Sequence, residues 1–184
     1  MLDLARASIK SGLAGDRDSP LPTDPDLQQL AGCFVSLHET RGHRLRGCVG
    51  RLDAKASLAE TVAAMSRAVL EDPRFLTNPV TLGDLFDLDI ELSILSPLIP
   101  APSPMDFDLI NDGIYLTHGE RSGCFLPQVA RETGWSRQQL LDRLCMEKLG
   151  LPSSTWRHPD TRLYRFTTLL IGPEPFIKSD IGTI

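Results

Sequence analysis

Two strand–turn–strand segments limit the fold more than any other feature of this 184-residue chain. The first spans 32–50 with a turn around Gly42, and the second spans 113–128 with a tight turn at Gly119-Glu120. Because short turns join only antiparallel neighbours, the pattern predicts two β-hairpins. The four predicted strands cover residues 32–37, 44–50, 113–118 and 121–128.

A helical pattern and a further strand follow each hairpin. After the first, Ser57 caps a helix that should stop before the next proline, and an alternating strand covers 88–96. After the second, Ser136 caps a helix that ends at Gly150, and a strand covers 163–170. The sequence thus predicts an α+β fold with largely antiparallel sheet and helices packed on it. Its order is consistent with a duplicated hairpin, helix and strand.

We expect one domain over 1–184 with two lobes, joined by a proline-rich hinge. The predicted parts are an N-terminal helix 1–13, a loop 14–28, a first half 29–97, a hinge 98–106, a second half 107–172 and a C-terminal tail 173–184.

Composition limits the classes of partner, the location and the metal or cofactor content that we expect. A net charge of −5 and only 6% aromatic residues argue against a nucleic-acid-binding surface. No signal-like or membrane-length apolar run is present, so we expect a cytoplasmic protein whose four cysteines are reduced. The absence of C-x-x-C and H-E-x-x-H patterns predicts no dedicated metal site, and no cofactor is expected.

The segment 44–50 holds the strongest chemical signal. In a regular strand Arg46 and Cys48 share one face, about 7 Å apart, while Leu45 and Val49 share the other. A guanidinium at that range favours the thiolate, and Gly47 lets a ligand or a neighbouring backbone come close. The plainer interpretation is a buried structural cysteine.

Two acidic residues complete the candidate site. Asp72 lies at the end of the predicted helix that Ser57 caps, and it can pair with Arg74. The plainer interpretation of this pair is a charged helix end. Glu91 lies on the predicted strand 88–96, where it would form an ion pair with Arg46 if the two strands were neighbours.

These motifs together resemble the AMMECR domain family, whose bacterial and archaeal members are called AmmeMemoRadiSam system protein A. The resemblance extends from about Gly32 to Phe166. The motifs that carry it include FVSL at 34–37, LRGCVG at 45–50, DPRF at 72–75, LDIELSILSP at 88–97 and LPQVA at 126–130.

The resemblance implies a single two-lobed α+β unit and a binding or active site at the segment matching 45–50. It implies partners as well, since bacterial family members occur beside or fused to a Memo-like protein, similar to extradiol dioxygenases, and beside a radical-SAM protein. The family pattern also marks Asp72, Arg74 and Glu91 as neighbours of the site and adds Gln128 as a ligand-binding candidate. The biochemical role of the family is not established.

Two functional hypotheses follow. In the first, the chain holds a small anionic ligand or a partner's segment in a cleft lined by Arg46, Asp72, Arg74 and Glu91. Gly47 and Gln128 are further ligand-binding candidates, and the hypothesis predicts that Cys48→Ser is tolerated and that Arg46→Ala loses binding. In the second, the chain is an enzyme in which Cys48 is a nucleophile or redox thiol, with Glu91 orienting Arg46 or moving a proton. We place binding ahead, because no histidine motif supplies a base for Cys48.

Overall fold

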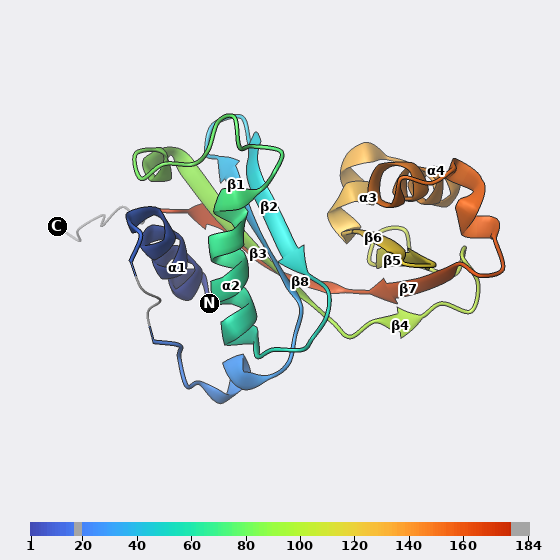
Figure 1. Ribbon diagram of the computed structural model, residues 1–184, viewed down its shortest axis with the longest axis horizontal. Coiled ribbons are helices and arrows are strands. Elements are labelled where there is room, and N and C mark those ends of the chain that lie inside the picture. Colours follow the sequence, from blue (N-terminus) through green and yellow to red (C-terminus); the bar gives the residue numbers. More distant parts are fainter. Residues whose placement is uncertain (17–19, 178–184) are drawn as a thin grey trace. The chain divides into compact units, whose positions relative to one another are not determined.

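Both predicted hairpins form, and each lies in a four-stranded sheet of its own (Figure 1). The computed structural model describes residues 1–16 and 20–177. By its contacts the chain divides into two units, Met1–Leu95 with Leu169–Ile184, and Ser96–Thr168. With helices beside antiparallel sheets, the predicted α+β class is confirmed.

The first unit has the strand order β2-β1-β3-β8. A capping box between Ser57 and Glu60 begins its second helix, as predicted, and Gly15 ends the first helix with φ 73°. Its elements are α1 (Leu2–Ala14), β1 (Cys33–Glu39), β2 (Leu45–Arg51), α2 (Leu58–Ala68), β3 (Leu88–Leu95) and β8 (Thr168–Pro175), with 3-10 turns η1 (Pro25–Gln28), η2 (Val69–Glu71) and η3 (Asp84–Asp87).

The core of the first unit lies between one face of this sheet and helices α1 and α2. Alternate strand residues reach it, for example Val35 and Leu37 on β1 and Ile90 and Leu92 on β3, all fully buried. The intervening positions therefore point to the opposite face of the sheet, which is mostly polar. On β1 and β3 these positions are Phe34, Ser36, His38, Asp89, Glu91, Ser93 and Leu95.

The second unit has the strand order β4-β7-β5-β6, and its core joins the sheet to helices α3 and α4. Gly150, at φ 64°, ends the helical run that Ser136 begins, as predicted. Its elements are β4 (Ile99–Pro100), β5 (Gly113–His118), β6 (Arg121–Phe125), α3 (Pro127–Thr133), α4 (Arg137–Arg143), the π-helix η4 (Leu144–Leu149), the 3-10 turn η5 (Ser153–Arg157) and β7 (Arg162–Phe166).

The two sheets repeat one arrangement. In each, the first hairpin strand is flanked by its hairpin partner and by the strand that follows the helix, giving β2-β1-β3 and β6-β5-β7. The Gly-Cys dipeptides also match, since Gly47 pairs with Leu37 and Gly123 with Leu116. Shared order and register support an internal duplication.

Two sequence predictions were wrong in detail. The predicted strand 121–128 ends at Phe125, because Pro127 begins a helix at the position where its missing N–H costs nothing. The predicted strand 163–170 is two strands, β7 and β8, which belong to different sheets. The residue types do not show such a change of sheet, because strand-forming residues continue from β7 into β8.

The segments outside the two predicted halves also carry structure. The predicted hinge contains β4, which pairs with β7, and the predicted tail contains the end of β8 and the buried Phe176. Positions 17–19 of the predicted loop and 178–184 of the predicted tail lie outside the described residues. Across the described part of the chain, no helix combines the length and apolarity needed to cross a membrane.

Candidate functional site

A β-bulge sets the geometry of the segment 45–51. Cys48 pairs with Ser36 and Gly47 with Leu37, but Leu45 pairs with His38, so Arg46 is the extra residue. Because Ser36 and His38 share one face of β1, Cys48 and Leu45 lie on that face together. The prediction that Leu45 and Val49 lie on the same face of the strand is therefore wrong.

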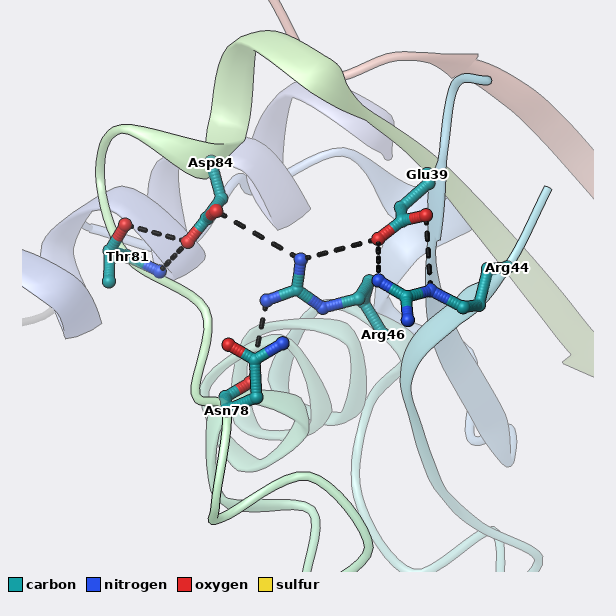
Figure 2. A network of polar contacts seen from close by, with 6 residues as sticks. All are labelled: Glu39, Arg44, Arg46, Asn78, Thr81 and Asp84. Atoms are coloured by element: carbon teal, nitrogen blue, oxygen red, sulfur yellow. Dashed lines mark hydrogen bonds and ion pairs between the residues drawn. The ribbon is translucent and has the colours of Figure 1, made fainter. Parts of the chain in front are cut away.

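The bulge directs Arg46 into a polar network (Figure 2). Its guanidinium lies between two carboxylates, with Nη1 3.7 Å from Glu39 Oε1 and 3.9 Å from Asp84 Oδ1. Nη2 donates to the Asn78 carbonyl at 3.4 Å. All of these contacts are long for a charged pair, so the network holds the guanidinium loosely.

Each carboxylate of this network also has a closer partner. Arg44 donates to Glu39 through Nε at 3.1 Å, and the Thr81 N–H and hydroxyl donate to Asp84 at 2.7 and 2.6 Å. Hydrogen bonding from Arg44 lowers the pKa of Glu39, and hydrogen bonding from Thr81 lowers the pKa of Asp84. Both carboxylates are thus ionised at neutral pH, and their negative charges compensate the buried positive charge of Arg46.

Arg46 itself is 7% exposed, and its Nε has no hydrogen-bond partner within residues 1–16 and 20–177. A guanidinium buried this far offers little surface to a ligand arriving from solvent. Its position suits a cation that joins β2 to the segment between α2 and β3.

A tighter charged pair lies at the outer edge of β2. Asp72 is 3% exposed and accepts hydrogen bonds from the Cys48 N–H at 2.9 Å and from Arg74 Nε and Nη2 at 3.0 and 2.6 Å. Arg74 Nη2 also donates to the Cys48 carbonyl at 2.9 Å. β2 is an edge strand, so the pair occupies the outward N–H and C=O that another strand would otherwise bind. The predicted pairing of Asp72 with Arg74 is confirmed.

This arrangement strongly favours the ionised carboxylate. Burial by itself raises the pKa of Asp72, but the hydrogen bonds from Arg74 and from the Cys48 N–H outweigh it and lower the pKa to about 2. The hydrogen bond to Asp72 in turn raises the pKa of Arg74. The two residues form a fixed ion pair, which we call the Asp72–Arg74 brace.

The brace places the guanidinium of Arg74 beside Cys48, where the sequence predicted the guanidinium of Arg46. The Arg74 side chain is 52% exposed, and its Nη1 makes no hydrogen bond within the described parts of the chain. Cys48 is half-buried. A ligand that reaches Cys48 therefore meets Arg74.

A polar row crosses the sheet from Cys48. On adjoining strands Cys48 pairs with Ser36, and Ser36 pairs with Glu91. Two interstrand spacings separate the Cα atoms of Cys48 and Glu91 by about 10 Å. Ser36, in the middle of the row, is buried. Ser36 was not predicted as a site residue, although its position two residues before His38 on the first strand places both on the same face.

The other predicted site residues take different positions. Because β1 lies between β2 and β3, the expected ion pair of Glu91 with Arg46 on a neighbouring strand is wrong. The space beside Gly47 is taken by the protein itself, since a Cβ there would lie 2.9 Å from the Val69 carbonyl oxygen. Gln128 lies on α3 in the second unit.

The remaining cysteines are poorer candidates for chemistry. Burial raises the pKa of Cys33 to about 12 and also raises that of Cys145. Within residues 1–16 and 20–177, no group of three or more His, Cys, Asp or Glu side chains is arranged to hold a metal ion.

Comparison with known proteins agrees with the motifs. The AMMECR1 family matches residues 2–171. A protein of Methanothermobacter thermautotrophicus is 39% identical over 175 residues, covering 90% of this chain and 88% of its own length. One of Thermococcus gammatolerans is 35% identical over 185 residues, covering 95% and 89%. The crystal structure of uncharacterized protein PH0010 from Pyrococcus horikoshii is similar with a TM-score of 0.84 and 31% identity, covering 92% of this chain and 87% of that one.

Proposed function

The chain belongs to the AMMECR1 family, and we propose that it is a binding component: the first unit takes a small anionic ligand at Arg74, beside Cys48, and the protein acts with Memo-like and radical-SAM proteins. The observation that carries the binding proposal is the Arg74 guanidinium. It is half-exposed, yet hydrogen bonds from Nε and Nη2 fix it in place.

A cation that is already fixed loses little conformational freedom when a ligand arrives. Nη1 is available to an oxyanion, and guanidinium groups bind carboxylates and phosphates in particular. This favours a small carboxylate or phosphate.

Inorganic phosphate is a suitable probe. Titrated into 15N-labelled protein, it should shift the Arg74 Nε–Hε resonance, and Arg74→Gln should abolish saturable binding. Arg44→Gln is the matched control, because Arg44 lies in the same hairpin, is 67% exposed and is likewise held by a carboxylate, Glu39. Equal loss in both variants, no saturable shift in the wild type, or loss with Arg46→Gln but not with Arg74→Gln would contradict the proposal.

The partnership with Memo-like and radical-SAM proteins is supported by the family motifs alone. Affinity purification of the tagged full chain from its native host, followed by mass spectrometry, tests it. Recovery of neither protein would overturn this part of the proposal and leave ligand binding to be judged on its own.

A second candidate is an enzyme in which Cys48 is the nucleophile or redox thiol, with Glu91 moving a proton. It is favoured by the position of Cys48, which is half-buried at a fixed point of β2 with Arg74 beside it. Iodoacetamide should then alkylate Cys48 far faster than Cys33 or Cys145, and Arg74→Gln should slow the reaction. A Cys48→Ala variant with full activity in a reconstituted system would eliminate this candidate.

A further inference from the structure

An apolar hollow lies on the first unit, away from the Asp72–Arg74 brace. Its volume is about 490 Å³, and its walls are α1 on one side and the segment around η3 on the other. On the α1 side, the lining side chains of Ala7, Ser11 and Ala14 are small and recur at helical spacing. The opposite wall consists of Leu82, Leu85 and Phe86, and Ile177 closes one side.

Two large apolar side chains of that wall are strongly exposed. Phe86 is 74% exposed and Leu82 is 51% exposed, whereas Leu85 between them is 2% exposed. Leu85 anchors the turn in the core, so its neighbours on either side stand out from the surface. Exposed apolar side chains next to an apolar hollow are typical of a protein contact surface.

The polar network of Figure 2 holds this wall in position. Asp84 accepts two hydrogen bonds from Thr81 and lies 3.9 Å from the guanidinium of Arg46. It is also the first residue of η3, the turn that contains Leu85 and Phe86. Thr81 therefore fixes the start of the turn that presents the exposed side chains, and the long contact of Asp84 with Arg46 links this turn only loosely to β2.

Charges of both signs border the hollow, on one helix and its end. Lys10 and Asp16 both line it. Neither has an ion-pair partner within residues 1–16 and 20–177, and the Lys10 ammonium instead lies 6.0 Å from the centre of the Phe176 ring. A partner that covers the hollow can pair with both charges.

From these features we infer that the hollow is the interface of a homodimer with two-fold symmetry, in which Leu82 and Phe86 of one copy cover the hollow of the other. A two-fold contact must be self-complementary, because the same surface faces itself. Here an apolar projection lies beside an apolar hollow, and Asp16 directly follows the C-cap residue of the helix that carries Lys10. When two copies of α1 meet in antiparallel orientation, Lys10 of each copy faces Asp16 of the second copy.

A second copy fits these features better than a small molecule does. A small-ligand site usually has a few polar groups that converge on the ligand, whereas this surface is apolar at its centre and charged at its rim, like a protein interface. The pairing of opposite charges across a two-fold axis also sets the orientation of the two copies.

Sedimentation equilibrium of the full chain, from low to high micromolar concentration, tests the inference. The wild type should dimerise, and Phe86→Ser should raise the dissociation constant at least tenfold. Leu76→Ser is the matched control, because Leu76 is 60% exposed but does not line the hollow. It should leave the dissociation constant unchanged.

Charge reversal tests the symmetry. Lys10→Glu alone and Asp16→Lys alone should each weaken the dimer about tenfold, because each puts like charges in contact twice. The double variant should restore it, because every cross-copy pair again has opposite signs. A wild type that is monomeric at all concentrations overturns the inference, and so does a dimer that is insensitive to Phe86→Ser or a double variant weaker than either single one.

Discussion

The two hairpins of the molecule share a plan but are fastened in different ways. In both, an edge strand carries a Gly-Cys dipeptide, and the glycine faces a helix at very short range. In the first hairpin the next residue, Cys48, is bound through its backbone by the Asp72–Arg74 brace. In the second, Arg121 at the start of β6 donates to the carbonyls of Leu149 and Gly150 at the end of η4.

The difference shows what a duplicated fold can keep and what it can change. Close approach of strand and helix belongs to the shared architecture, and both glycines serve it. The charged brace belongs to the first hairpin, where it leaves a fixed, half-exposed guanidinium beside a cysteine. We therefore look for function at the first hairpin and for shared folding constraints at both.

The largest effect is expected from removing the carboxylate of the brace. Asp72→Ala leaves the Cys48 N–H and the Arg74 guanidinium without their acceptor, and should lower the free energy of unfolding by about 3 kcal/mol. Urea denaturation followed by circular dichroism measures this loss. Asp142→Ala is a control in the second unit, where the carboxylate accepts one hydrogen bond, from Trp156 Nε1. A smaller loss for Asp72→Ala than for Asp142→Ala would contradict a dominant role for the brace.

Acid should weaken the first hairpin through the same residue. The pKa of Asp72 is lowered from 3.8 to about 2 in the folded protein, so its contribution to stability is complete above pH 4 and is lost as the pH falls toward 2. The shift corresponds to about 2 kcal/mol. Urea denaturation of the wild type and of Asp72→Asn between pH 5 and pH 2 checks this, and parallel pH curves for the two proteins would refute it.

The two glycines should show a similar, smaller effect. A Cβ at Gly47 would lie 2.9 Å from the Val69 carbonyl oxygen, and one at Gly123 would lie 2.4 Å from the Lys148 Cβ. Neither neighbour is the far end of a flexible side chain, so Gly47→Ala and Gly123→Ala should each cost about 2 kcal/mol. Thermal unfolding of both variants measures this. A large loss at one glycine and none at the other would break the parallel between the hairpins.

The sequence by itself determined the local parts of this protein. Both hairpins, the capped starts of α2 and α4 and the pairing of Asp72 with Arg74 depend on residues close together in the chain, so spacing and residue type were enough to predict them. The order of these elements predicted the α+β class correctly, and the family motifs agreed with it. The prediction from local sequence was wrong at Pro127, which begins a helix instead of lying in the predicted strand.

Only the tertiary structure decided which arginine meets Cys48. One extra residue in β2 ended the regular alternation, because a shift of one position exchanges the two faces of a strand. Arg46, two residues from Cys48 in the chain, is thereby directed to Glu39 and Asp84, while Arg74, 26 residues away, donates to its carbonyl. A bulge and a return of the chain are set by the packing of distant segments, and the alternation of residues along a single strand cannot reveal either.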